Sequence, residues 1–196
     1  MEKNIIHQEY KISRSLRRKA NGHNSFLIFF TGFSGSGKST IANALEQKLH
    51  HLNIKTYVLD GDNVRSGINQ NLSFSKKDRS ENIRRIGEIS KLFVDAGVVV
   101  LAAFIAPYKK DREFIKAIID RENYVEVFVN TTLEECEIRD VKGLYKKARK
   151  GEIKNMTGIS APYEAPQNAD VEVSELHSVD ESVEIIYNKI KNKLIL

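Results

Sequence analysis

Short apolar runs alternate with amphipathic stretches along most of the chain. The runs that predict strands are Phe26–Thr31, Thr56–Leu59, Val98–Phe104, Tyr124–Val129 and the short Val171–Val173. Apolar residues at helical spacing predict helices over Ser39–Leu52, Lys76–Ala96, Lys109–Asp120, Leu133–Asp140 and Val179–Lys193. Strict alternation of the two is typical of α/β proteins with a mostly parallel sheet between helical layers. Ligands of such folds bind at the carboxyl ends of the strands.

A glycine-rich segment follows the first predicted strand and opens the first predicted helix. It reads GFSGSGKST and matches the pattern G-x-x-x-x-G-K-[ST]. Its backbone N–H groups can point at one phosphate, Lys38 can reach the outer phosphates, and Ser39 can ligate Mg²⁺. The motif predicts a P-loop NTPase-type three-layer αβα fold that binds a nucleoside triphosphate. The phosphate-binding residues would be Gly32, Ser34, Gly35, Ser36, Gly37, Lys38, Ser39 and Thr40.

Two carboxylates follow the second predicted strand, in the run Asp60-Gly61-Asp62-Asn63-Val64-Arg65. A kinase that phosphorylates a hydroxyl needs an acceptor for its proton and ligands for Mg²⁺. We expect Asp60 to organise the metal together with Ser39, and Asp62 to accept or orient the hydroxyl proton. A small backbone rotation would exchange these two roles. Arg65 would clamp an anionic substrate, so the predicted catalytic residues are Lys38, Asp60, Asp62 and Arg65; the alternative is an ordinary Asp/Gly/Asn turn.

Composition places the chain among globular proteins. Of its 196 residues, 41% are hydrophobic and 29% are charged, with a net charge of +5. No apolar run approaches the roughly 18 residues of a membrane span, and the N-terminus lacks a signal-peptide pattern. The single Cys136 excludes an internal disulfide and favours the reducing cytoplasm. We predict one domain over 26–196, preceded by a solvated basic arm over 1–25 that carries Lys11, Arg14, Arg17, Arg18 and Lys19.

A second basic segment, Arg139–Pro166, contains three glycines and ends with two prolines. Long segments of this kind are typically functional lids. We predict a lid at 139–157 that excludes water and neutralises charge during phosphoryl transfer; the alternative is an exposed basic helix. The first basic segment, Lys11–Lys19, has neither the interleaved aromatic residues nor the zinc spacing of a nucleic-acid-binding module. We therefore expect no nucleic-acid or membrane partner.

Taken together, these segments resemble the adenylylsulfate kinase (APS kinase) family from about Gly22 to Asp170. The motifs that carry the resemblance are GFSGSGKST, LDGDNVR, FS-x-x-DR-x-ENIRRIGE, AAFIAPY, RDVKGLYKKAR and GEIKNMTGISAPYEAP. The resemblance implies transfer of the ATP γ-phosphate to the 3′-hydroxyl of adenosine 5′-phosphosulfate (APS), with Mg²⁺, in a homodimer. It also implies that Arg139 contacts the ATP adenine. The implied APS pocket comprises Asp62, Asn63, Val64, Arg65, Phe74, Arg79, Asn82 and Ile105, closed by Lys142, Leu144, Asn155 and Met156.

Two positions depart from the family pattern. Ala106 stands where many members have a serine that has been proposed as a phosphorylated intermediate, so the sequence permits only direct in-line transfer. Met156 stands where a phenylalanine usually stacks on the APS adenine, and its thioether can still contact an aromatic ring. The alternatives are another small-molecule P-loop kinase, or a catalytically silent nucleotide-sensing or nucleic-acid-binding module, against which the intact Lys38, Ser39, Asp60 and Asp62 argue.

Overall fold

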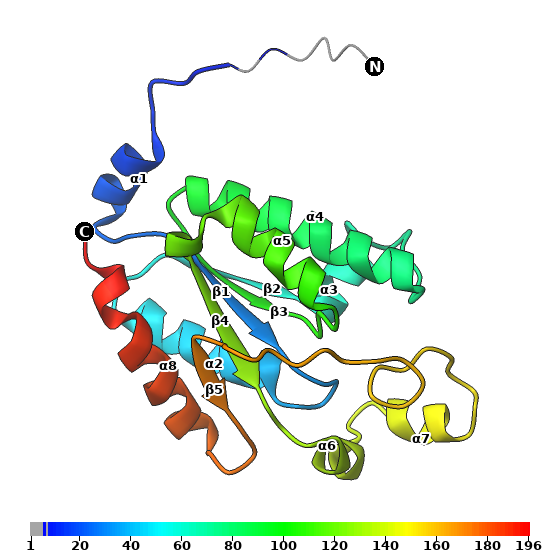
Figure 1. Cartoon of the computed structure of the whole chain (residues 1–196). Coiled ribbons are helices and arrows are strands. Elements are labelled where there is room, and N and C mark those ends of the chain that lie inside the picture. The colour runs from blue at the N-terminus through cyan, green and yellow to red at the C-terminus, as the bar shows by residue number, and fades with distance from the viewer. Residues whose placement is uncertain (1–5, 7) are drawn as a thin grey trace.

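A five-stranded parallel sheet, in the order β2-β3-β1-β4-β5, forms the centre of the molecule (Figure 1). The structure is a computed structural model that describes residue 6 and residues 8–196. All the predicted strands are present, and each begins and ends within one residue of the predicted limits. Their bounds are β1 Leu27–Thr31, β2 Thr56–Asp60, β3 Val99–Ala103, β4 Tyr124–Val129 and β5 Val171–Val173.

Strand β1 lies between β3 and β4, and every one of its residues is buried. This explains its continuous apolar sequence, since both of its faces are covered by helices. Its side chains alternate between two hydrophobic clusters. Ile28 and Phe30 pack toward helices α2 (Lys38–His51) and α8 (Val179–Leu194), whereas Leu27 and Phe29 pack toward α4 (Lys76–Asp95) and α5 (Lys109–Ile119). Figure 1 shows these two helical layers on opposite sides of the sheet, so the predicted αβα architecture is confirmed.

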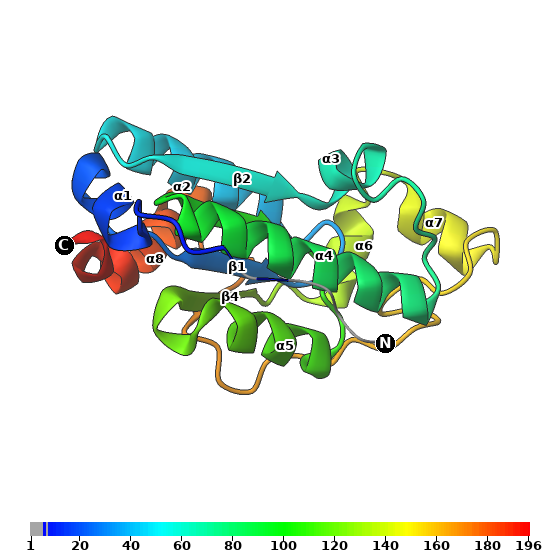
Figure 2. The ribbon, with the colours of Figure 1, turned by 90° about the horizontal axis from the view of Figure 1, so that it is seen from above.

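Three short helices at the carboxyl ends of the strands surround the region where ligands are expected. They are α3 (Gly61–Ser66), α6 (Leu133–Arg139) and α7 (Leu144–Arg149), and Figure 2 shows them grouped beyond the tips of β1 and β2. Only α6 was predicted. Helix α3 begins directly after β2 because the Asp60 carboxylate accepts a hydrogen bond from the N–H of Asp62 at 2.9 Å and so caps it. The fold thus turns the two aspartates of the sequence motif toward one end of the sheet.

The N-terminal region contains a helix that we did not predict, α1 (Arg14–Asn21), preceded by the capping residue Ser13. Arg17 forms an ion pair with Asp95 at 2.7 Å, and the guanidinium of Arg18 donates to the Ser25 hydroxyl at 2.9 Å. These two arginines are therefore bound to the body of the protein, which corrects the prediction that they are solvated. Residues 1–5 and 7 of the predicted arm lie outside the described residues. A short 3₁₀ helix, η1 (Arg121–Asn123), precedes β4.

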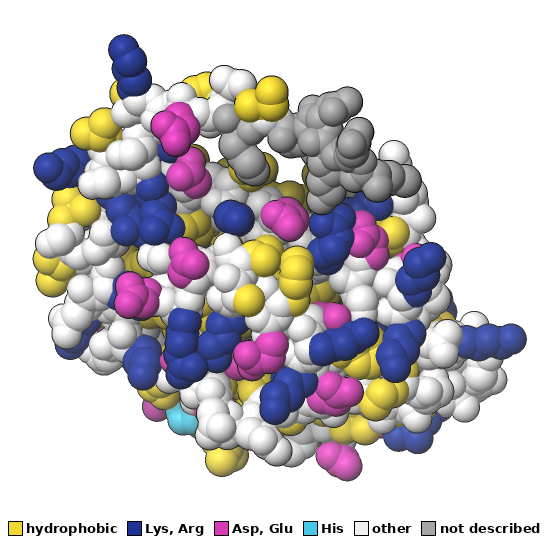
Figure 3. Space-filling view, turned by 45° about the horizontal axis from the view of Figure 1, so that its top comes forward, with side chains coloured by type: hydrophobic (Ala, Val, Ile, Leu, Met, Phe, Trp, Pro, Cys, Tyr) yellow, Lys and Arg dark blue, Asp and Glu magenta, His cyan; other side chains and the backbone are white. Residues whose placement is uncertain are grey.

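The part of the chain that the structure describes contains no helix that is both long and apolar enough to cross a membrane. On the face seen in Figure 3, lysine and arginine side chains are interspersed with aspartate and glutamate.

Candidate active site

A cavity of about 330 Å³ opens at the carboxyl ends of the central strands. One wall is formed by residues of the glycine-rich loop Gly32–Thr40, here called the phosphate loop. The other walls come from α3, α4, the turn after β3 and the lid segment 139–157. Most of the predicted site residues meet here: Ser34, Gly35, Gly37, Lys38, Ser39, Thr40, Asp60, Asp62, Arg65, Phe74, Arg79, Asn82, Ile105, Lys142, Leu144 and Met156.

The phosphate loop is shaped as an anion cradle. Gly32 has φ +151°, and a Cβ there would lie 2.5 Å from the carbonyl oxygen of Val129, so only glycine fits. Within the described residues, the backbone N–H groups of Gly35, Gly37, Lys38 and Ser39 have no protein acceptor. The positive end of α2 adds to them. The loop therefore offers several convergent donors and a partial positive charge, which suit a phosphate group.

The side chain of Lys38 completes this cradle. Its Nζ donates to the carbonyl oxygens of Gly32 at 3.0 Å and Phe33 at 2.5 Å, and the residue is only 7% exposed. Burial lowers the pKa of Lys38 to about 8, partly offset by the attraction of neighbouring Cys136 and Asp60. An anionic ligand in the cradle would favour the charged amine. The site thus contains a buried cation whose charge depends on what is bound.

The residues present fit a magnesium ion. The Ser39 hydroxyl donates to the Asp60 carboxylate at 2.6 Å, so two oxygen ligands lie together beside the phosphate loop. The described residues contain no group of three or more His, Cys, Asp or Glu side chains placed to hold a metal. A pair of oxygen ligands such as Ser39 and Asp60 suits Mg²⁺, which keeps several waters and is bound through one or two protein oxygens plus substrate phosphates.

The opposite wall is cationic and aromatic. The guanidinium of Arg65 lies over the Phe74 ring, 4.4 Å from its centroid. Arg79 donates from Nε to the Phe74 carbonyl oxygen at 2.9 Å, and its other nitrogens donate to Thr157 and to the carbonyl oxygen of Asn155. Burial lowers the pKa of both arginines, and the mutual repulsion of Arg65 and Arg79 lowers that of Arg65 further. A flat ring beside two cations suits a planar ligand that carries negative charge.

The lid segment is docked over the cavity. Lys142 forms an ion pair with the carboxylate of Asp62, and Arg79 holds the backbone near Asn155. Met156 is 7% exposed and belongs to a small cluster with Tyr145, Ala148 and the partly buried Leu144 of α7. The Tyr145 hydroxyl donates to the Ser34 carbonyl oxygen at 2.8 Å, which ties this cluster to the phosphate loop. The lid segment therefore contacts both walls of the cavity.

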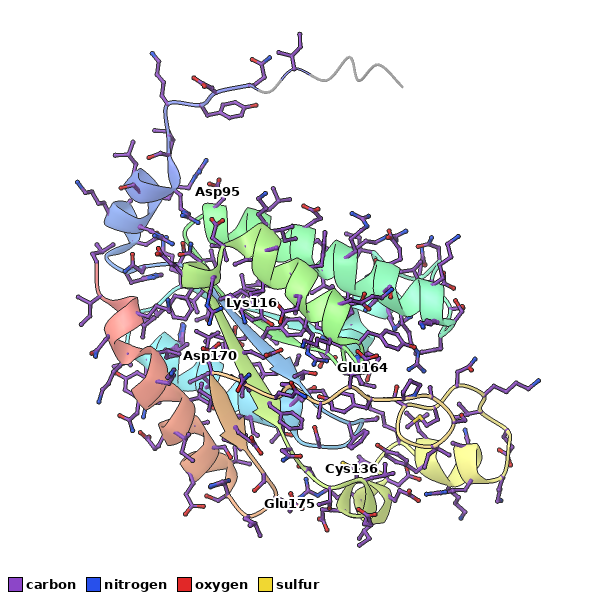
Figure 4. All side chains as sticks on the ribbon, in the orientation of Figure 1. Asp95, Lys116, Cys136, Glu164, Asp170 and Glu175 are labelled. Atoms are coloured by element: carbon purple, nitrogen blue, oxygen red, sulfur yellow. The ribbon has the colours of Figure 1, made fainter. Side chains whose placement is uncertain are left out.

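The turn after β3 forms the floor between the two walls. Ala106 has φ +43°, a region that residues with a Cβ rarely adopt, and its carbonyl oxygen accepts from Arg112 at 2.8 Å. Arg112 is buried, pairs with Glu126 at 3.1 Å, and also donates to the Glu164 carbonyl oxygen at 2.7 Å. Figure 4 shows Glu164 beside the end of α5, where its carboxylate accepts from the N–H of Lys109 at 2.7 Å. This network fixes the backbone of Ile105 and Ala106 in place.

Several predicted residues are not part of the cavity wall. Gly32 and Ser36 instead accept from Lys38, and Val64 is buried in the core against α4 because the short helix α3 turns it inward. Asn63 lies on the outer side of α3, where its carbonyl oxygen accepts from Ser66 at 2.8 Å. Arg139 pairs with Glu135 at the end of α6, and Asn155 contributes its carbonyl oxygen to Arg79. Lining residues that we did not predict are Gly61, Ile83, Ala103, Phe104, Ala106, Pro107, Val141 and Thr157.

The chain is similar in sequence and fold to known proteins. Residues 24–174 match the family model of adenylylsulphate kinase. An adenylyl-sulfate kinase of Oceanobacillus iheyensis is 51% identical over 191 residues, covering 97% of this chain and 96% of the relative. One from Staphylococcus epidermidis is 52% identical over 188 residues, covering 95% and 94%. The solved APS kinase of Mycobacterium tuberculosis, in complex with AMPPNP and APS, has a TM-score of 0.83 at 42% identity and covers 86% of this chain and 98% of that one.

Proposed function

This chain belongs to the adenylylsulphate kinase family, and we propose how its own residues carry out the family's reaction. The reaction is transfer of the ATP γ-phosphate to the 3′-hydroxyl of APS, which yields ADP and 3′-phosphoadenosine 5′-phosphosulfate. The observation that carries the assignment is the two-sided cavity, which has a phosphate cradle on one wall and a cationic, aromatic surface on the other.

ATP binds with its phosphates in the phosphate loop. The N–H groups of Gly35, Gly37, Lys38 and Ser39, which have no acceptor among the described residues, donate to the phosphate oxygens. Lys38 exchanges its contacts with loop carbonyl oxygens for the outer phosphates. A bound Mg²⁺ would neutralise charge on these phosphates, held by the Ser39 hydroxyl and the Asp60 carboxylate. Arg139 pairs with Glu135 at the end of α6, and both side chains are partly exposed. Arg139 can therefore leave this pair and contact the adenine of ATP.

APS binds against the opposite wall. Phe74 offers its ring to the adenine, while Arg65 and Arg79 compensate the two negative charges of the phosphosulfate. Asp62 lies between the two walls and accepts or orients the proton of the 3′-hydroxyl. Lys142, which pairs with Asp62 in this structure, then forms an ion pair with an anionic oxygen of one of the substrates. Transfer is direct and in line, because Ala106 offers no hydroxyl for a phosphorylated intermediate.

The lid segment excludes water from the closed site. Met156 packs beside the cavity and replaces an aromatic stacking partner with a polarisable thioether. We further propose a cytoplasmic homodimer without nucleic-acid or membrane partners. The free, buried Cys136 on α6 (Figure 4) and the mixed charges of the surface in Figure 3 support the location and the lack of a nucleic-acid partner, and the family resemblance supports the dimer.

An acceptor panel tests the proposal. Purified enzyme with Mg²⁺ and ATP is offered APS, gluconate, shikimate or RNA, and ADP release is measured together with the phosphorylated product. We expect turnover with APS only, and loss of about 10²–10³ in rate for Lys38→Ala. Turnover of gluconate or shikimate in preference to APS would assign the chain to a different small-molecule kinase.

A further inference from the structure

A row of hydrogen-bonded polar side chains, buried at Asn69 and partly exposed at Arg85, continues from Asn82 away from the cavity. Asn69, which is fully buried, donates from Nδ2 to Oδ1 of Asn82 at 2.9 Å. The Oδ1 atom of Asn69 accepts from Nη1 of Arg85 at 3.2 Å. Arg85 is in turn held by Glu81, which accepts from Nε at 2.9 Å. The line of hydrogen bonds thus runs from Arg85 on α4 through Asn69 to Asn82, which lies on the same helix at the cavity wall.

The direction of this line is set by Arg85. A guanidinium carries only N–H donors, so the atom of Asn69 that faces it must be the carbonyl oxygen. The amide nitrogen of Asn69 then faces Asn82, and Asn82 must present its own oxygen inward. The remaining Nδ2 group of Asn82 has no acceptor among the described residues, and Asn82 lines the cavity. The wall therefore offers a donor at this point.

We propose that Asn69, oriented by Arg85, is a positioning residue that fixes Asn82 as a hydrogen-bond donor toward an acceptor atom of APS. This inference rests on the proposed function, which places APS against this wall. The NH₂ group and the oxygen atom of an asparagine amide have nearly the same shape, so the two ends differ only in that one donates and the other accepts a hydrogen bond. Without a fixed neighbour, Asn82 can turn over and present an oxygen to a dianionic substrate, which would weaken binding.

The backbone of Asn69 joins the two elements that hold this substrate. Its N–H donates to the Val64 carbonyl oxygen at 3.0 Å, which anchors it to α3, the helix that carries Asp62. Its side chain reaches Asn82 on α4. Asn69 thus fixes the donor direction of Asn82 relative to the catalytic carboxylate.

The substitution Asn69→Asp reverses the donor while preserving size and the acceptor for Arg85. Both carboxylate oxygens accept, so Asn82 must turn its NH₂ group inward and its oxygen toward APS. We expect the KM for APS to rise about 10- to 100-fold, with the KM for ATP unchanged. Asn71→Asp is the matched control, because exposed Asn71 accepts from the same Arg85 nitrogen at 2.9 Å but does not contact Asn82. This control adds the same charge and should leave both KM values unchanged.

Further variants separate the possible outcomes. Asn82→Ala should raise the KM for APS, and adding Asn69→Asp to it should produce little further change, because the two act through one contact. If Asn82→Ala has no effect, the proposed APS wall is wrong. If Asn82→Ala has its effect but Asn69→Asp does not, or if Asn71→Asp matches Asn69→Asp, the positioning role is overturned. Should Asn69→Asp fail to fold, Asn69→Ser leaves the donor direction unfixed, and the absence of any rise in the KM for APS would equally overturn it.

Discussion

Nucleotide binding should be accompanied by uptake of a proton at Lys38. In the free protein, burial lowers the pKa of Lys38 from 10.5 to about 8. Phosphate oxygens in the cradle favour the charged amine and should return its pKa toward the ordinary value. The expected uptake is then the fraction of Lys38 that is neutral before binding. That fraction is about a tenth of a proton at pH 7, about half at pH 8 and about nine-tenths at pH 9.

The lowered pKa of Lys38 also predicts how nucleotide affinity and the free energy of unfolding change with pH. Above pH 8, binding must first protonate the amine, so nucleotide affinity should weaken with rising pH, approaching about tenfold per pH unit. In the free protein the unfolded chain binds more protons than the folded one between about pH 8 and 10.5, since the folded pKa is the lower. The contribution of Lys38 to the free energy of unfolding should therefore increase with pH across that window.

Isothermal titration calorimetry measures the uptake directly. ADP with Mg²⁺ is titrated into the enzyme at pH 8 and pH 9, without APS, in buffers that differ in ionisation enthalpy. Lys38→Met should abolish the buffer dependence, whereas Lys48→Met should keep it. Lys48 lies on the same helix but pairs with Glu184 away from the cavity. Zero uptake in the unmodified enzyme, or equal uptake in Lys38→Met, would refute the placement of the nucleotide phosphates against Lys38.

Three further predictions concern the chemistry and the lid. Asp60→Asn should raise the Mg²⁺ concentration needed for half-maximal rate, whereas Asp62→Asn should lower kcat by about 10²–10⁴ and leave that concentration unchanged; a MgCl₂ titration showing the opposite pattern would exchange their roles. Because Ala106 has no hydroxyl, incubation with γ-labelled ATP without APS should leave no acid-stable label on the protein, and stoichiometric label would contradict direct transfer. Amide hydrogen exchange over Arg139–Thr157 should slow when ADP and APS bind, and Lys142→Ala should raise the KM for APS; equal exchange in both states would make the segment a fixed scaffold.

The strands and long helices were predictable because their patterns are strong and local. A continuous apolar run such as Phe26–Thr31 has few structural alternatives, and the glycine-rich pattern marks one exact turn between strand and helix. The short helices were missed for different reasons. Helix α1 has no buried residue, so no hydrophobic period marks it, although Ser13 and Gly22 are suitable end signals. Helix α7 lies in the basic segment that we predicted to be a lid, where an exposed basic helix was the alternative.

The position of the candidate site was predictable where one local motif sets the backbone, as at Lys38 and Ser39, which line the cavity. It was not predictable where side-chain direction depends on tertiary packing. Val64 occupies a motif position beside Asp62, yet one turn of α3 directs it into the core. Asn69 looks like an ordinary turn residue in sequence. Its contact with Asn82 arises only once α3 and α4 are packed together.

A structure of the enzyme with ADP, Mg²⁺ and APS bound would show directly whether Asp62 meets the hydroxyl that is phosphorylated. The quantity to measure is the distance from the ribose 3′-oxygen of APS to the Asp62 carboxylate. We predict hydrogen-bond reach, about 2.6–3.2 Å, with the ADP phosphates on the N–H groups of Gly35, Gly37, Lys38 and Ser39 and the adenine of APS on Phe74. An APS molecule bound away from Phe74, or one whose 3′-oxygen faces away from both Asp62 and the phosphate loop, would contradict it.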